Sequence, residues 1–162
     1  MIAKLIVEGK EFDIEILDPK LQELITPKKK TGYERVEQGK YFWYQNGDGS
    51  VMCGYDHHNV NCNNYFDHAN YYSDMTVAED NARADSLMRQ LRRFAVEHRN
   101  GELDYDCGVY TIHWDGKRIT TIRQYSKDFG HILFDSGNTC NLAIETFHDE
   151  LIWYFTEYRD SL

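Results

Sequence analysis

The sequence has few of the features that mark membrane, secreted or disordered proteins. Its 162 residues include only 2 prolines and 11 glycines against 14% aromatic residues, a composition that argues against disorder. No apolar run approaches the roughly 20 residues that a membrane span needs. The first residues show neither the basic flank nor the long apolar stretch of a signal peptide. We therefore expect a folded cytoplasmic protein.

The motifs of several large enzyme classes are missing as well. The sequence has no Gly-x-Ser-x-Gly elbow, no Walker loop and no dinucleotide-binding fingerprint. Its four cysteines form no Cys-x-x-Cys pair, so we expect reduced thiols, some of them buried as small apolar groups. We expect no cofactor.

Basic residues are in deficit, and the deficit is uneven. The chain has 18 Lys and Arg against 27 Asp and Glu, a formal net charge of −9. Residues 101–162 hold five basic and eleven acidic side chains, so they carry −6 of that total. Because phosphate backbones bind Lys and Arg, this balance disfavours direct nucleic-acid binding and favours docking onto a basic partner surface.

Turn signals predict three hairpins. The first lies at Glu8-Gly9-Lys10-Glu11, and a short helix should follow Asp18-Pro19. The second turns at Asn46-Gly47-Asp48-Gly49 and the third at Asp115-Gly116, where Asn, Asp and Gly suit tight turns. Further strand material follows the later hairpins, and the polar stretch DHHNVNCNN reads as a loop. That strand material is YF and NYYS after the second hairpin, and GHILFD after the third.

Two long amphipathic helices complete the pattern. One is predicted over residues 75–99, capped by Ser73 or Asp74, and the other over 140–158, capped by Asn138 or Thr139. The first has an apolar face with steps of three and four; its members are Ala84, Leu87, Met88, Leu91, Phe94 and Ala95. The second has an inward stripe of Cys140, Ala143, Ile144, Phe147, Leu151 and Phe155.

The predicted fold class is α+β. Two β-β-β-α units are expected to share one antiparallel sheet, with both long helices packed on it, because each unit alone leaves its sheet partly bare. The N-terminal hairpin and short helix are added at the edge of a single compact domain. The boundaries are 1–30 for the N-terminal part, 31–100 for the first unit and 101–162 for the second unit.

One stretch, residues 53–70, concentrates ligand-type side chains. Cys53, His57, His58 and Cys62 are the metal-ligand candidates in it, although their spacing matches no standard zinc finger. Asp56-His57-His58 also resembles short signatures of metal-dependent phosphoesterases and nucleases, whose other motifs are absent here. The alternative is a polar loop whose ligand-type residues do not converge.

Aromatic and acidic residues supply the partner-binding candidates. Tyrosine and tryptophan are typical of interface hot spots, and carboxylates spaced along a surface can imitate phosphates. The alternatives are cross-strand pairs that only stabilise a sheet, and an ordinary solvated acidic face. The candidates are Tyr41, Trp43, Tyr44, Tyr55 and Tyr71 among the aromatic residues near the first hairpin, and Asp104, Tyr105, Asp106, Asp149 and Glu150 in the last third.

Several segments together resemble small proteins carried by phages and conjugative elements of Gram-positive bacteria. These segments are KKKTGYERV (Lys28 to Val36), the YFWY hairpin, LMRQLRRFAVEH (Leu87 to His98) and NLAIETFHDELIWYF (Asn141 to Phe155). The resemblance implies no catalytic residues. It implies a setting, since small acidic proteins of mobile elements often bind and block host defence machinery, including CRISPR nucleases.

The sequence thus leads to one main hypothesis and two alternatives. The main hypothesis is a non-catalytic protein of the host bacterial cytoplasm that inhibits a basic nucleic-acid-handling enzyme by nucleic-acid mimicry. The most plausible target is a CRISPR effector nuclease. One alternative is a metal-dependent nuclease or phosphoesterase using Asp56, His57 and His58. The other is an accessory module for single-stranded nucleic acid that uses the aromatic residues from Tyr41 to Tyr72.

Overall fold

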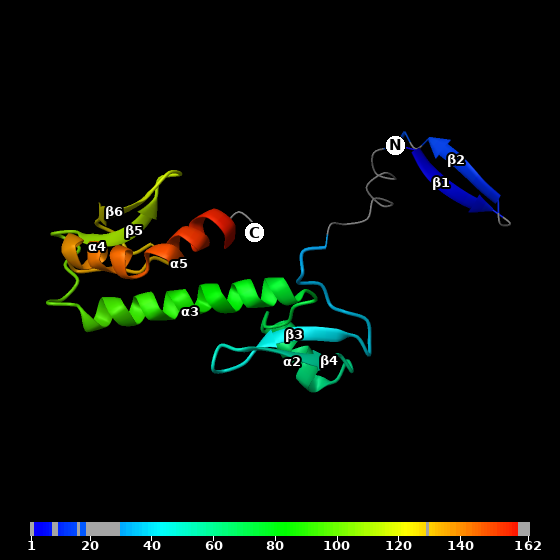
Figure 1. Ribbon diagram of the computed structural model, residues 1–162, viewed down its shortest axis with the longest axis horizontal. Coiled ribbons are helices and arrows are strands. Elements are labelled where there is room, and N and C mark those ends of the chain that lie inside the picture. The colour runs from blue at the N-terminus through cyan, green and yellow to red at the C-terminus, as the bar shows by residue number, and fades with distance from the viewer. Residues whose placement is uncertain (1, 8–9, 16, 19–29, 129, 159–162) are drawn as a thin grey trace.

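The computed structural model describes residues 2–7, 10–15, 17–18, 30–128 and 130–158 (Figure 1). In these residues hairpins alternate with helices, which confirms the α+β class. The strands are β1 (Ile2–Val7), β2 (Lys10–Glu15), β3 (Tyr41–Gln45), β4 (Val51–Tyr55), β5 (Val109–Trp114) and β6 (Ile119–Gln124). The helices are α2 (Val60–Asp67), α3 (Met75–Glu97), α4 (Gly137–Thr146), α5 (His148–Trp153) and the π-helix η1 (Tyr154–Tyr158).

Helix α3 is the spine of the molecule. It begins after Asp74, whose side chain accepts hydrogen bonds from the backbone N–H groups of Thr76 and Val77, so one of the two predicted caps is correct. Four members of the predicted apolar face are buried: Ala84, Leu87, Leu91 and Ala95. Figure 1 shows β3, β4 and α2 on one side of α3, and β5, β6, α4 and α5 on the other.

Two separate cores result from this arrangement. Phe42, Cys62 and Tyr71 form the smaller core, between the β3–β4 hairpin and α2. The larger core joins α3 to the second unit; its buried members are Leu87, Leu91, Ala95, Phe134, Cys140, Ala143 and Leu151. The β3–β4 and β5–β6 hairpins therefore each bury one face against helices.

The predicted shared sheet is wrong. The described strands form three separate two-stranded antiparallel sheets, β1–β2, β3–β4 and β5–β6. The predicted third strand of each unit shrinks to a single bridge, from Trp43 to Tyr72 in the first unit and from Tyr110 to Phe134 in the second. The two units therefore share no strand pairing among the described residues.

The reason for the missing third strands is the length of chain before each helix. Tyr72 stands two residues before the cap Asp74, and Phe134 stands two residues before the cap Ser136, so one bridge forms before the chain turns into the helix. In the first unit, the stretch predicted as a loop and as YF strand material instead forms α2, capped by Asn59, whose side chain accepts from the N–H of Cys62 (3.0 Å). Only three residues separate the cap of α2, His68, from the bridge at Tyr72.

The second long helix differs from its prediction. It begins at Gly137 after Ser136, so the expected caps Asn138 and Thr139 are wrong. It is also interrupted at Phe147, whose φ and ψ of −111° and 22° are not helical, and the chain continues as α5 and η1. The inward stripe survives the interruption, since Cys140, Ala143 and Leu151 are all buried.

The N-terminal hairpin is confirmed as an antiparallel pair that lies away from the other elements in Figure 1. The short helix predicted after Asp18-Pro19 lies outside the described residues. None of the helices among the described residues is both long and apolar enough to cross a membrane.

Candidate functional site

The Asp56 side chain, the centre of the proposed metal-dependent site, is completely buried. Its carboxylate accepts two hydrogen bonds from Arg35 (2.9 and 3.3 Å), one from the Tyr71 hydroxyl (2.8 Å) and one from the backbone N–H of His58 (2.7 Å). Burial alone would raise the pKa of Asp56, but these donors outweigh it and hold the pKa well below its usual value. The Asp56 carboxylate is thus a charged, fully hydrogen-bonded group that holds Arg35, Tyr71 and the backbone at His58 together.

This arrangement leaves Asp56 little capacity to hold a metal or to act as a base. His57 is exposed, and the His58 ring nitrogen lies 3.7 Å from Asp56. Cys62 is buried with its thiol directed to the Tyr55 carbonyl (3.6 Å), while Cys53 is exposed. Across the described residues, no three His, Cys, Asp or Glu side chains are grouped so that they can hold a metal ion.

The Thr-Gly-Tyr-Glu-Arg run, residues 31–35, links the hairpin part of the first unit to α3, and we call this run the clasp. Glu34 accepts from the backbone N–H groups of Thr31 (2.6 Å) and Gly32 (3.0 Å). Tyr33 packs on Tyr72 with ring centroids 5.5 Å apart, and its hydroxyl accepts from Asn81 on α3 (2.8 Å). With Arg35 bound to Asp56, every residue of the run has a structural contact.

We expect Gly32→Ala to destabilise the fold by about 3 kcal/mol. Gly32 has φ of +87°, and a Cβ atom there would lie 2.6 Å from Val77 Cγ2, so both backbone strain and a clash oppose the substitution. Gly39→Ala is the matched control, because Gly39 has φ of +84° with no heavy atom within 4 Å of the added Cβ. In urea unfolding, we expect the control to lower the free energy of unfolding by about 1 kcal/mol. Equal losses for both variants would contradict the stabilising role of the clasp.

The clasp should also make stability depend on pH. The Thr31 N–H bond is the main cause that lowers the pKa of Glu34 from 4.5 to about 2. Because the folded pKa lies below the unfolded one, this stabilisation is present above pH 4.5 and is lost as the pH falls toward 2. The advantage of the wild type over Glu34→Gln in urea unfolding should therefore shrink over that range. An advantage that stays constant between pH 6 and pH 3 would contradict this interpretation.

The outer end of the β3–β4 hairpin carries a tyrosine pair, Tyr41 and Tyr55. The two residues are direct cross-strand partners, their ring centroids lie 4.2 Å apart, and their hydroxyls form a hydrogen bond. Each residue is 49% exposed. The same face of the hairpin turns toward α3 at its other end, where the Gln45 amide lies beside Asp85 and Arg89. The tyrosine pair is therefore the uncovered end of a partly covered sheet face.

The other aromatic candidates are less available. Trp43 and Tyr44 are half-buried, and Tyr44 packs on Tyr65 of α2 with centroids 4.4 Å apart. Tyr71 is only 2% exposed and stacks on Phe42, and burial is the main cause that raises its pKa to about 12. Tyr71 is thus a core residue, and its place among the partner-binding candidates is wrong.

The acidic candidates divide in the same way. Glu150 forms a two-bond ion pair with Arg83 of α3 (2.8 and 3.1 Å), so its charge is matched within the chain. Asp104 accepts from the backbone N–H groups of Asp106 and Cys107 and so shapes its own turn, and Tyr105 is half-buried. Asp106 is exposed, and the Asp149 side chain, at 102%, is fully exposed. Asp106 and Asp149 therefore remain exposed to a partner, although Asp149 Oδ1 also lies 3.1 Å from His148 Nδ1.

The tyrosine pair and the acidic segment Glu102–Asp106 do not share one surface. The bridge from Trp43 to Tyr72 ties the hairpin to the start of α3, whereas the acidic segment follows the end of that helix. The 23 residues of α3 span about 35 Å at 1.5 Å per residue. A partner that touches both regions has to reach along the length of the spine.

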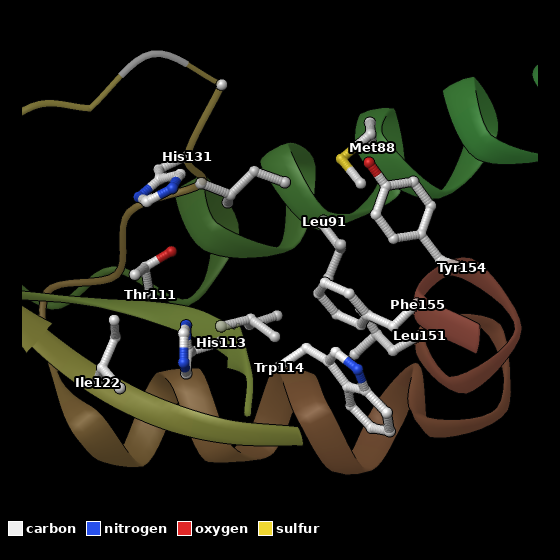
Figure 2. Close-up of a pocket in the computed structure, with 13 residues that line it drawn as sticks. Met88, Leu91, Thr111, His113, Trp114, Ile122, His131, Leu151, Tyr154 and Phe155 are labelled. Atoms are coloured by element: carbon white, nitrogen blue, oxygen red, sulfur yellow. The ribbon is translucent and has the colours of Figure 1, made fainter. Parts of the chain in front are cut away.

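A cavity of about 230 Å³ lies in the second unit, between α3, β5 and the α5–η1 segment (Figure 2). It occupies the place where the predicted third strand would have continued, because residues 130–132 line it without pairing to β5. Trp114 and Phe155 stack along one wall with centroids 5.8 Å apart, and Figure 2 shows the hydroxyl of Tyr154 pointing toward Met88.

The cavity offers little for catalysis. His113 and His131 are among its lining residues, but the described lining has no carboxylate, thiol or lysine, and the Asp128 carboxylate outside the lining lies 3.9 Å from His131 Nδ1, beyond hydrogen-bond distance. Its volume is below the roughly 300 to 1,000 Å³ of most ligand pockets, so it suits one ring or one large side chain.

Sequence reasoning missed two features of these sites. The Arg35–Asp56 pair joins residues 21 positions apart, and nothing in the local pattern around either residue announces the other. Helix α2 did have a signal, because Asn59 is a good N-cap residue three positions before Cys62, but the many Asn residues around it also suit a loop.

Comparison of the whole chain with protein families, with curated proteins and with solved structures finds no match.

Proposed function

We propose that the protein is a non-catalytic binding protein that docks onto a basic nucleic-acid-handling enzyme of the host and inhibits it, with a CRISPR effector nuclease as the first candidate. The observation that carries the proposal is the tyrosine pair. Two half-exposed tyrosines in mutual contact at the open end of the hairpin provide a large contact area whose members already hold each other in place before binding.

Charge supports the proposal at longer range. The second unit carries most of the net charge, and Asp106 and Asp149 are exposed within it. An acidic surface steers a protein toward a basic channel and raises the association rate more than the final affinity. In this proposal the tyrosine pair anchors the complex and the acidic residues guide the encounter.

The test is a cleavage assay with purified CRISPR effector nucleases from Gram-positive hosts, their guide RNAs and labelled target DNA. Wild-type protein should inhibit at least one nuclease in the panel. Tyr41→Ala/Tyr55→Ala should raise the half-inhibitory concentration about 30-fold, the equivalent of a hot spot of about 2 kcal/mol. Tyr125→Ala removes an exposed tyrosine (62%) on the other unit and should leave inhibition unchanged. No inhibition by the wild type, or equal inhibition by all three proteins, would overturn the proposal.

The acidic residues should act on the association rate. We expect Asp106→Lys/Asp149→Lys to slow association with the inhibited nuclease about tenfold at low salt and to change dissociation little. Biolayer interferometry at 50 and 300 mM salt measures both rates. Asp104 and Glu150 are left intact because their contacts are structural. An association rate that neither salt nor charge reversal alters would contradict electrostatic guidance.

A further inference from the structure

One seam of α3 runs the whole length of the helix and changes character halfway. Its positions follow alternating steps of four and three, so they lie on one helix face. The early members Ala78 and Ala82 are buried, whereas the late members are exposed. The full seam is Ala78, Ala82, Asp85, Arg89, Arg92 and Val96, and Arg99 follows directly after the helix cap His98.

The change occurs where the β3–β4 hairpin ends. The hairpin turn reaches α3 at Arg89, whose Nη2 would lie 3.6 Å from a Cβ placed on Gly49. The second unit packs on the other side of the same half of the helix, against Leu87, Leu91 and Ala95. Figure 1 shows the underside of this half of α3 uncovered.

Two arginines on the uncovered half, Arg89 and Arg92, and a third just after the helix cap, Arg99, are suited to an anion, and we call the three the arginine seam. The Gln45 amide, with its oxygen toward Arg89 Nη2 (3.2 Å) and its nitrogen toward Asp85 Oδ2 (3.1 Å), holds Arg89 in place. Arg92 and Arg99 form no ion pair with any described residue. The neighbouring Arg93 is bound to Glu97 (2.7 Å) and is not counted.

We propose that the arginine seam binds the phosphate backbone of a nucleic acid. A guanidinium presents a fork of donors that matches phosphate, and every exposed basic residue along this half of the helix is an arginine. From Arg89 to the helix end at Glu97 the helix rises about 12 Å, the axial length of about three to four phosphates of one strand. Val96, 66% exposed between Arg92 and Arg99, offers an apolar contact for a sugar or base.

The net charge of −9 is concentrated outside α3, although the acidic segment Glu102–Asp106 begins three residues after Arg99. The acidic excess lies in residues 101–162, whereas within the seam Asp85 is the only acidic member and it faces Gln45. The inference rests on the seam alone and does not depend on the tyrosine pair or on inhibition of a nuclease.

The test is fluorescence anisotropy with a labelled 20-nucleotide single strand and a 20-base-pair duplex, from 20 to 200 mM KCl. Three phosphate contacts predict that log K falls against log salt with a slope of about −2 for the single strand and about −3 for the duplex. Arg92→Glu/Arg99→Glu, which keeps Arg89 beside Gln45, should weaken binding at least tenfold. The triple variant that also has Arg89→Glu should abolish it.

The matched control is Lys117→Glu/Arg118→Glu/Lys127→Glu, which changes the net charge equally at exposed positions of the second unit. It should weaken binding less than threefold. No binding by the wild type at 20 mM KCl, or equal losses in both triple variants, would overturn the proposal. So would sedimentation showing that the seam instead holds a second copy, as an oligomer that the seam variant dissociates and nucleic acid does not affect.

Discussion

Replacing Asp56 with alanine should lower the free energy of unfolding by about 3 kcal/mol. The substitution removes the acceptor of four hydrogen bonds and leaves the buried Tyr71 hydroxyl and the His58 N–H without their partner. Arg35 is partly exposed, so water can hydrate its guanidinium in the variant. The expected loss of stability is therefore smaller than the largest losses seen when buried ion pairs are broken. Urea unfolding followed by tryptophan fluorescence measures the effect.

The matched control for this prediction is His57→Ala. His57 is adjacent in sequence and exposed, so its loss should change stability by less than 0.5 kcal/mol, about the limit for surface substitutions. Because Asp56 has a lowered folded pKa, its contribution should fade as the pH drops below its ordinary value, so the wild type should approach Asp56→Asn in acid. Full stability of Asp56→Ala at pH 7 would show that this hydrogen-bond network does not stabilise the fold.

Phe134→Ala should destabilise the protein even more, by about 4 kcal/mol. Phe134 is completely buried in the larger core, and its backbone forms the bridge to Tyr110 that holds the start of α4 beside β5. Truncating a buried phenylalanine removes apolar contact and leaves a cavity, which typically costs 3 to 5 kcal/mol. The loss is measurable by the same unfolding experiment.

Phe12→Ala provides the comparison for Phe134→Ala. Phe12 lies on β2 of the N-terminal hairpin and is 49% exposed, so we expect a loss below about 1 kcal/mol. If both variants lose the same amount, the assignment of Phe134 to the core of the second unit is wrong.

The parts of the fold that sequence predicts well are those with local causes. Helix α3 has a cap, an apolar face and a length that agree with one another, and the structure follows the prediction within two residues at its end. The turns at Asn46–Gly49 and at Asp115-Gly116 form where Gly49 and Gly116 adopt φ of +90°. Each of these signals involves residues close together in the chain.

The predictions that failed concern features that depend on contacts between residues far apart in the sequence. Strand material before each helix pairs at one residue only, because the N-cap of the helix stands two residues later, and periodicity does not reveal such a limit. Tyr71 and Tyr72 are adjacent and both buried, which breaks the alternation that assigns one of them to the surface. The Glu150 carboxylate is paired with Arg83, which stands 67 positions away in the sequence, so its charge is balanced within the chain.

The candidate site was therefore only partly predictable. Composition singled out tyrosines and carboxylates, but the structure decides which of them a partner can reach: Tyr41 and Tyr55 are open, while Tyr71 is closed. Among the carboxylates, Asp106 and Asp149 are exposed, whereas Asp104 and Glu150 are engaged in the chain's own contacts. The docking proposal accordingly rests on fewer residues than the sequence suggested.

The most direct test of the docking proposal is hydrogen exchange of the protein alone and in complex with an inhibited effector nuclease, followed by mass spectrometry. We expect slower exchange in residues 41–55, which carry the tyrosine pair, and little change in residues 132–145 of the second core. Exchange in 41–55 that is the same with and without the nuclease, while inhibition is complete, would contradict the account.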